Sequence, residues 1–529
     1  MKPFDANGAF RSVANESGAL RHLAVRGAGV TVLSGGLVQA IQVIATVVLA
    51  RLLTPEDFGV VAMVTTFSLL FLNFGLNGFT EAVLQREEID HFLVSNLFWI
   101  NLAAGLLLTA GFAAAGSLVA RFYSNPRVTP VAAGISATIL ITSTSVLHLA
   151  LLKRAMHFFA VSVNDIVARA ISVAASILLA WAGWGCWALV AGAVAQSLST
   201  SLGAFTLCRW VPSRPRRVAG TASMVRFAMH VYGRFSLNYC ARNMDNALVG
   251  WRFNAQALGF YKKAYDLFAL SAPLFVQSLT SVAVSALSRL KRDSHEFRRY
   301  LLSALSLAAF VGMGLGTDLT LVGKDVIRLL LGPAWEPAGR IFTFFGPGIG
   351  MMFIYGTHSW IHLSIGRADR WLRWTIFELA VTGLLFVLGL RWGPAGIALA
   401  WTASFWILTI PALWYAGRPI HFTIGPVLAA VWKYIVASLL AGWGTVVIIG
   451  ALPFSVAAPG WIPAVARLAG VSSLFSVLYM GAVVLLHRGC APLYQGARLL
   501  REAVPWGGFA TPSLAVASRG ATSLSDSLR

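Results

Sequence analysis

The sequence has few charged residues: Asp, Glu, Lys and Arg make up only 12% of its 529 residues, whereas 57% are hydrophobic. Soluble domains carry about twice this share of charge, so the composition excludes a chain of ordinary soluble domains. Cysteine is also scarce. The four cysteines are scattered and lack metal-ligand spacing, so we predict neither a disulfide framework nor a metal site, and no cofactor. They are Cys186, Cys208, Cys240 and Cys490.

Acidic residues are half as frequent as basic ones, 20 against 41, which leaves a net charge of +21. In a soluble protein this excess would suggest nucleic acid as a partner. If the N-terminus is cytoplasmic, however, 27 of the 41 basic residues fall on the cytoplasmic side of the predicted helices and 11 on the other. This asymmetry follows the positive-inside rule. It predicts two cytoplasmic termini and contacts with membrane lipids, and no nucleic-acid partner.

Long apolar segments indicate the fold class. A membrane-spanning helix needs about 20 mostly apolar residues, and the sequence contains about fourteen such segments. We therefore predict an all-α polytopic membrane protein, with two pseudosymmetric six-helix bundles followed by two C-terminal helices. The segments are 28–50, 58–80, 93–120, 128–152, 157–181, 185–207, 224–250, 257–288, 298–323, 338–364, 372–390, 393–416, 428–451 and 463–487.

A weak internal repeat relates the two bundles. The junction ARLLTPEDFG (50–59) matches GWRFNAQALG (250–259) in register, and WGCWALV (184–190) matches PAGIALA (394–400) at nearly the same offset. Each junction offers a helix-capping residue, Thr54 or Asn254, before an apolar segment. Two matches at one spacing favour duplication, and internal repeats with a substrate path between them are typical of transporters.

The helices and the repeat divide the chain into six parts. A cytoplasmic tail without a cleavable signal peptide precedes the first bundle, a basic linker separates the bundles, and a partly disordered tail ends the chain. Their ranges are 1–27 (tail), 28–207 (first bundle), 208–223 (linker), 224–416 (second bundle), 417–487 (two further helices) and 488–529 (tail, with disorder expected from about 507).

Charged residues inside the spans are the candidate site, because each costs roughly 2.5–3.5 kcal/mol at a helix centre on insertion scales. In the seventh segment, Arg234, Asn238, Arg242 and Asp245 fall on one helical face. That face must look into protein or water. Arg234 has no acidic partner in its own helix, and a surplus guanidinium suits a phosphate-bearing substrate.

The fifth segment carries a second polar face with Asp165 and Arg169 at the i,i+4 spacing that favours an ion pair. Two polar faces in apolar helices predict a hydrated cavity. The alternative is structural: Asp165 with Arg169, and Arg242 with Asp245, would be charge pairs that hold helices in register.

Three further polar residues lie in the second bundle. Glu378 stands alone among apolar neighbours and is interpreted as a proton or cation site or, equally, as a structural hydrogen-bonding group. His358 and His362 are one helical turn apart. Without other metal-type ligands nearby, we interpret them as packing or lumen-wall residues.

Three strings resemble a known family: ARLLTPEDFGVVAM (50–63), ARNMDNALVGWRFNAQALGFYKKAYDL (241–267) and LLGPAWEPA (330–338). They are similar to the Wzx-type polysaccharide flippases of the multidrug, oligosaccharidyl-lipid and polysaccharide exporter superfamily, closest to the colanic acid exporter group. The similarity covers about residues 30–417. It implies an inner-membrane protein that flips undecaprenyl-pyrophosphate-linked oligosaccharides by alternating access, beside a glycan polymerase and chain-length regulator.

On this resemblance, Arg234, Arg242 and Arg169 would hold the pyrophosphate, with Asn238 in the lumen, while Asp165, Asp245 and Glu378 would serve coupling or structural pairing. Two alternatives stay open. A small-molecule antiporter of the same superfamily would have a more acidic cavity. A membrane polymerase or ligase of lipid-linked glycans would be expected to offer a large external loop with an acid and base pair, which the short loops here do not provide.

Overall fold

The computed structural model describes residues 1, 3–5, 7–10, 17–270, 273–291, 293–451, 461–490 and 494. The disorder expected from residue 507 onward therefore lies outside the described residues. Within them the chain forms fifteen α-helices and three short 3-10 helices. Ten helical segments among these residues are long and apolar enough to cross a membrane. The predicted fold class, an all-α polytopic membrane protein, is confirmed.

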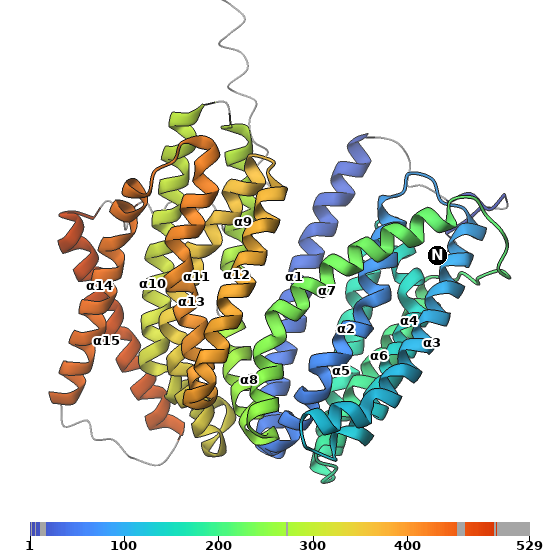
Figure 1. The fold of residues 1–529 in the computed structure, drawn as a ribbon, viewed down its shortest axis with the longest axis horizontal. Coiled ribbons are helices and arrows are strands. Elements are labelled where there is room, and N and C mark those ends of the chain that lie inside the picture. Colours follow the sequence, from blue (N-terminus) through green and yellow to red (C-terminus); the bar gives the residue numbers. More distant parts are fainter. Residues whose placement is uncertain are drawn as a thin grey trace, which may run out of the picture.

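Two helical lobes stand side by side in Figure 1, with α7 crossing between them. The N-lobe contains α1 (Ser17–Leu52), α2 (Pro55–Gln85), α3 (His91–Phe122), α4 (Val128–Arg154), α5 (Phe158–Trp181) and α6 (Cys186–Leu207). After α7 (Thr221–Arg252), the C-lobe contains α8 (Ala255–Leu270), α9 (Pro273–Arg289), α10 (Ser294–Leu331), η1 (Pro333–Trp335), α11 (Glu336–Ser364), α12 (Ala368–Gly389), η2 (Leu390–Trp392) and α13 (Gly393–Gly417). Following η3 (Arg418–Ile420), α14 (Ile424–Ala451) and α15 (Trp461–His487) pack against the outer side of α10.

Thirteen of the fourteen predicted segments correspond to one helix each, but the eighth does not. The segment expected as one helix over 257–288 is two helices, α8 and α9, on either side of residues 271–272. Pro273 opens α9, and a proline inside a continuous helix would remove a backbone hydrogen bond and clash with the preceding turn. In Figure 1, α8 lies at the lower end of the lobe and α9 at the upper end, so together they make one crossing.

The repeat junctions meet where the two lobes touch. Thr54 Oγ1 accepts a hydrogen bond from Asp57 N, and Asn254 Oδ1 accepts one from Ala257 N, so both predicted caps are present. Beyond the caps, the start of α2 crosses the start of α8. A Cβ added to Gly59 would overlap the carbonyl of Ala255, and one added to Gly259 would overlap the carbonyl of Pro55. The contact is reciprocal at an offset of 200 residues.

Trp335 of η1 reinforces this lower end. Its side chain is fully buried, donates from Nε1 to the carbonyl of Ala50 over 2.8 Å, and packs edge-on against Phe58 with 5.4 Å between ring centres. Lys263 of α8 lies over the Phe58 ring at 4.2 Å. All three strings that carry the family resemblance therefore contribute to one contact between the lobes.

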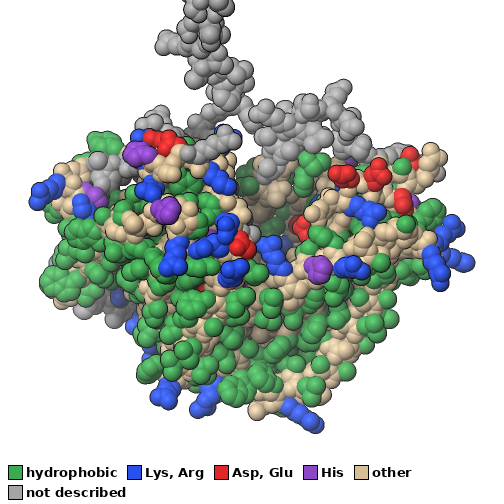
Figure 2. All heavy atoms as spheres, turned by 45° about the horizontal axis from the view of Figure 1, so that its top comes forward, with side chains coloured by type: hydrophobic (Ala, Val, Ile, Leu, Met, Phe, Trp, Pro, Cys, Tyr) green, Lys and Arg blue, Asp and Glu red, His purple; other side chains and the backbone are tan. Residues whose placement is uncertain are grey.

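The opposite, upper end is open. Figure 2, with that end turned forward, shows the surface hollowed between the lobes and charged side chains gathered above a hydrophobic band. Many of the charged side chains on this face are Lys and Arg.

The basic linker belongs to the N-lobe. Ser213 N donates to Ser95 Oγ and Arg216 N donates to Asn96 Oδ1, each over 3.0 Å, while Trp99 Nε1 donates to the Ser213 carbonyl. These bonds hold the linker on α3. Consequently α7 starts from the N-lobe, although its other end reaches α8, α12 and α13.

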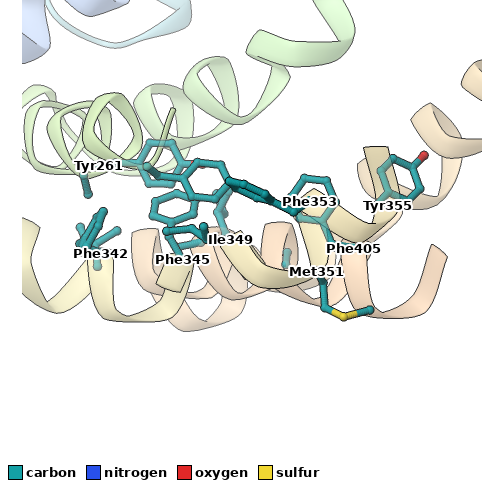
Figure 3. Close-up of a cluster of buried hydrophobic side chains, with 14 of the residues drawn as sticks. Tyr261, Phe342, Phe345, Ile349, Met351, Phe353, Tyr355 and Phe405 are labelled. Atoms are coloured by element: carbon teal, nitrogen blue, oxygen red, sulfur yellow. The ribbon is translucent and has the colours of Figure 1, made fainter. Parts of the chain in front are cut away.

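Aromatic side chains fill the core of the C-lobe around α11, as Figure 3 shows. Phe345 stacks on Phe268 with 4.8 Å between ring centres and lies 5.8 Å from Tyr261, both on α8. Tyr355, further along α11, packs 5.6 Å from Phe405 of α13. The core therefore ties α8, α11 and α13 into one body.

We expect Gly59→Ala to lower the thermal unfolding temperature of the purified protein. The new Cβ would overlap the Ala255 carbonyl, and overpacking of this kind costs about 1–3 kcal/mol. Gly259→Ala should do the same. The matched control is Gly111→Ala on α3, where nothing lies within 4 Å of the added Cβ. Unfolding at the wild-type temperature for both junction variants would show that the crossing is not a tight contact.

Candidate functional site

The polar face predicted on α7 is open along most of its length. Arg234, Asn238 and Arg242 are all exposed. The opposite face of α7 is fixed to α2, because the Tyr232 hydroxyl donates to the Leu70 carbonyl over 3.0 Å and the Tyr239 hydroxyl donates to the Thr66 carbonyl over 3.1 Å. Among the described residues, no ion pair within 4 Å involves either arginine. Two guanidinium groups are thus available on a helix between the lobes.

Asp245, predicted on the same face, is instead fully buried. Its Oδ2 accepts hydrogen bonds from the Tyr261 hydroxyl (2.7 Å) and Trp401 Nε1 (2.9 Å), and its Oδ1 accepts from Asn246 N. The face is continuous on α7, but α8 and α13 cover its last turn. The alternative interpretation of Arg242 with Asp245 as an ion pair is therefore not what this structure shows, since both oxygens of Asp245 have neutral donors.

Glu378 of α12 is half-buried and faces α7 and α11. Its carboxylate lies beside the Tyr355 hydroxyl, which also accepts a hydrogen bond from Trp374 Nε1 over 2.9 Å. Arg242 lies close enough to interact electrostatically with Glu378 and with Tyr265 of α8. Arg242 therefore projects toward the C-lobe, and the lone acid found in the sequence has a cation near it from another helix.

The polar face of α5 lines a different cavity, of about 510 Å³, within the N-lobe. Asp165 and Arg169 are close but do not approach within ion-pair distance, and Arg169 Nη1 donates instead to Gln42 Oε1 of α1 over 3.0 Å. The Arg169 Nε atom is buried without a partner among the described residues. Side chains from four helices surround the cavity: Thr31, Ser34, Gly35, Val38, Lys153, Phe158, Val161, Ser162, Asp165, Arg169, Gln196 and Thr200.

The predicted site residues thus fall into three places rather than one. Arg234, Asn238 and Arg242 share an open face, with Glu378 near its end, whereas Asp245 lies in the C-lobe core. Asp165 and Arg169 border the N-lobe cavity, whose lining includes no residue of α7. Lys153 and Gln42 are not among the residues predicted from the sequence, although Gln42 is recognisable there as an amide inside an apolar segment.

His358 and His362 are buried in the C-lobe, as their packing interpretation expects, with exposed fractions of 4% and 0%. His358 Nδ1 is 2.6 Å from the carbonyl of Tyr355. Three other ring nitrogens, Nε2 of His358 and both nitrogens of His362, are buried without a hydrogen-bond partner among the described residues. Packing alone leaves these three nitrogens unexplained.

Solved structures with this fold are membrane transporters. A structure of the lipid II flippase MurJ in an inward closed conformation has a TM-score of 0.69 at 14% identity, and the match covers 87% of this chain and 98% of that one. An inward-facing multidrug resistance MATE transporter of the MOP superfamily has a TM-score of 0.60 at 13% identity, with 72% and 94% covered. At these identities the likeness concerns the fold.

Curated relatives come from polysaccharide biosynthesis. The succinoglycan biosynthesis transport protein ExoT of Rhizobium meliloti is 20% identical, over 68% of this chain and 72% of its own length. The teichuronic acid biosynthesis protein TuaB of Bacillus subtilis is 24% identical, over 64% and 69%. The lipopolysaccharide biosynthesis protein WzxC of Escherichia coli is 19% identical, over 60% and 65%.

The family described as polysaccharide biosynthesis protein matches residues 48–340, more than half of the chain and the part that holds both repeat junctions. The match, the relatives and the fold agree with one another and confirm the resemblance to the Wzx-type branch of the exporter superfamily. The chain is a multi-pass membrane protein that belongs to the polysaccharide biosynthesis protein family.

Proposed function

We propose that this protein flips undecaprenyl-pyrophosphate-linked oligosaccharide repeat units across the bacterial inner membrane by alternating access. Its family and the printed names of its relatives, which include transport and lipopolysaccharide biosynthesis proteins, support this proposal. The match in fold to a lipid II flippase supports it independently. The protein forms no bond in this process and is not an enzyme.

The observation that carries the proposal is the open arginine face of α7. Arg234 and Arg242 lie on a helix between the lobes and have no ion-pair partner within 4 Å among the described residues. A guanidinium group is charged at every physiological pH and donates two parallel hydrogen bonds to phosphate oxygens. Two such groups on the same helical face suit the two phosphates of a pyrophosphate. Asn238 lies between them on that face and offers an amide to the same ligand.

The two-lobed form explains why a protein is needed. Burying sugar hydroxyls in hydrocarbon costs roughly 2–7 kcal/mol for each unpaired group, which no lipid carrier can overcome alone. A hollow between the lobes keeps the sugars in water while the polyprenyl tail stays in the bilayer. Because the lobes meet at the Gly59 and Gly259 crossing and separate at the basic end, the state seen here would accept substrate from the cytoplasm, where both termini would lie.

The N-lobe cavity would have an accessory role. Arg169 stands apart from the α7 arginines, and its cavity combines Lys153 and Asp165 with hydroxyl and amide groups. This mixture suits a sugar better than it suits a pyrophosphate alone. A glycan polymerase and a chain-length regulator would take over the flipped unit.

An antiporter of small molecules is the second candidate function. The open face of α7, however, carries two arginines and no acid, which favours an anionic substrate.

Deleting the gene should abolish surface polymer while complete lipid-linked repeat units accumulate on the cytoplasmic face, because their synthesis does not need the flippase. Lipid extraction and mass spectrometry would measure this accumulation. Longer glycans made by the purified protein in detergent would instead support the polymerase or ligase alternative.

Replacing Arg234 or Arg242 with Gln should reduce polymer export at least about tenfold at normal protein abundance, since a hydrogen bond to a charged group contributes roughly 1.5–3 kcal/mol. Lys should retain part of the export because it keeps the charge but not the planar donors. Arg214→Gln, in the exposed linker, is the matched control.

Asp245→Asn separates binding from stability. An amide in place of the buried carboxylate would turn a donor toward Asn246 N or lose one of its neutral partners, so this variant should lower the unfolding temperature, whereas the two Arg→Gln variants should not. Normal export by both Arg→Gln variants would remove the α7 face from the proposal.

Single cysteines at Arg214 and Glu56, in a background without the four natural cysteines, should label from opposite sides. Arg214 lies in the linker and Glu56 at the repeat junction, which the charge asymmetry places inside and outside, respectively. An impermeant maleimide applied to intact spheroplasts should therefore label only position 56. Labelling of position 214 from outside would invert the proposed orientation and the direction in which the hollow opens.

A further inference from the structure

The open arginine face of α7 is part of a longer stripe of polar side chains. Arg226 and His230 precede Arg234 at the same spacing of four residues that separates Arg234, Asn238 and Arg242. All five side chains are exposed, and we call them the α7 stripe. From its first member to its last the helix rises about 24 Å, which is comparable with the roughly 30 Å thickness of a hydrocarbon core.

The α7 stripe starts on the side of the helix opposite α2. Four residues advance a helix by about 400°, so each member is turned by about 40° from the one before it. Tyr232 and Tyr239, which donate hydrogen bonds to α2, project about 140–160° away from Arg234. The stripe therefore winds from the side opposite the N-lobe toward the C-lobe, where Arg242 faces Glu378.

The composition of α7 does not suit contact with lipid. Its 32 residues are enough to cross a membrane, but α7 is not among the ten described segments that are apolar enough to do so. Its only acidic residue is Asp245, which is buried in the C-lobe. The α7 stripe therefore presents cationic and neutral donors with no carboxylate of its own helix among them. Such a face needs water or an anionic ligand beside it.

The first two members of the α7 stripe have no charged partner. Among the described residues, no ion pair within 4 Å includes Arg226 or His230. Arg226 lies only about 8 Å along the axis from Thr221, where α7 begins at the upper end. This is the end at which Figure 2 shows charged side chains above a hydrophobic band. Arg226 and His230 therefore lie near the depth at which lipid head groups meet hydrocarbon.

We infer that Arg226 and His230 form an entry site for the pyrophosphate of the lipid-linked substrate, which then passes along the α7 stripe to Arg234 and Arg242; this inference rests on the proposed function. A guanidinium donates two parallel hydrogen bonds to a phosphate group, and an imidazole donates at least one in either protonation state. Consecutive members of the stripe are about 6 Å apart along the axis. The anion therefore meets the next donor before it has moved far from the previous one.

The entry site affects the rates of binding, whereas the inner arginines determine the affinity. Arg226 lies about 12 Å from Arg234 and about 24 Å from Arg242 along the helix axis. Exposed charges separated by more than about 8 Å are largely screened at physiological ionic strength. A pyrophosphate held between Arg234 and Arg242 therefore gains little from Arg226. Loss of Arg226 raises the barrier to entry and to exit equally, so both rates fall and the affinity stays the same.

The test measures the rates and the affinity of lipid binding separately. Cys240 of α7 is exposed, so a background without the other three cysteines carries an environment-sensitive fluorophore at this position. Undecaprenyl pyrophosphate in detergent micelles would be mixed with the labelled full-length protein in a stopped-flow instrument. Association and dissociation rates give Kd, which equilibrium titration of the same fluorophore checks.

We expect the entry-site variants and the inner-site variants to behave differently. Arg226→Gln should slow association and dissociation by the same factor, about tenfold for the loss of a hydrogen bond to a charged group, with Kd unchanged. His230→Leu should slow both rates in the same way. Arg242→Gln should instead raise Kd at least about tenfold, because it removes such a bond from the final bound state.

Two controls separate a positioned arginine from positive charge in general. Arg217→Gln removes an exposed arginine of the neighbouring linker and should leave both rates at their wild-type values. The double variant Arg226→Met with Met229→Arg keeps the net charge but moves the arginine by about 60° around the helix. Met229 is exposed, so the exchange disturbs no core packing. This double variant should bind the lipid as slowly as Arg226→Gln does.

Excess phosphatidylglycerol tests whether the entry site accepts any anionic lipid head group, because this phospholipid also carries a phosphate. Association of undecaprenyl pyrophosphate with the wild type at an unchanged rate would support a site for the pyrophosphate. Association as slow as that of Arg226→Gln would show that ordinary phospholipid occupies the site, and the inference would be wrong.

The remaining outcomes distinguish the entry site from the proposed function. Wild-type association rates for both Arg226→Gln and His230→Leu, or for the double variant, would overturn the entry site while the proposed function stands. A higher Kd for Arg226→Gln would assign Arg226 to the final binding site and would overturn the entry site as well. Absence of lipid binding by the wild type would overturn the proposed function, and the entry site with it.

Discussion

The reciprocal crossing of α2 and α8 is the constraint on which the arrangement of the lobes depends. Two backbones approach so closely there that only glycine fits at positions 59 and 259, and a closely packed contact of this kind has few alternative geometries. Trp335 and Lys263 pack around the crossing. The lobes therefore share one fixed end, and their separation at the other end is what exposes the α7 face. A movement that opens the fixed end must break all of these contacts together.

The helices could be predicted from the sequence because their signals are local. The lengths of the apolar segments predict each membrane-spanning helix. The capping residues Thr54 and Asn254 mark two helix starts that the structure contains. Apolar length does not reveal the break between α8 and α9, because the apolar segment continues through it; Pro273, which opens α9, is the local signal of the break. The crossing itself was only implied: the repeat showed that the junctions correspond, but not that they touch.

The site was predictable only as far as a single helix determines it. The 100° rotation per residue correctly grouped Arg234, Asn238 and Arg242 on one open face, but it could not show that other helices cover that face at Asp245. The partners of these groups are distant in the chain: Gln42 is 127 residues from Arg169, and Trp401 is 156 residues from Asp245. Rules based on residue spacing within one helix cannot predict contacts between residues so distant in the chain. These distant partners decide whether Arg169 and Asp245 form ion pairs or hydrogen bonds with neutral groups.

The hydrogen bond between Asp245 and Trp401 also bears on how the protein is made. At a synthesis rate of about 5–20 residues per second, the 156 residues that separate them take roughly 8–30 s to emerge. During that interval α7 has already left the ribosome with a carboxylate that has only Tyr261 and a backbone amide as donors. Its final burial must wait until α13 arrives. The packing of α7 against the C-lobe is thus completed only after α13 has been synthesised.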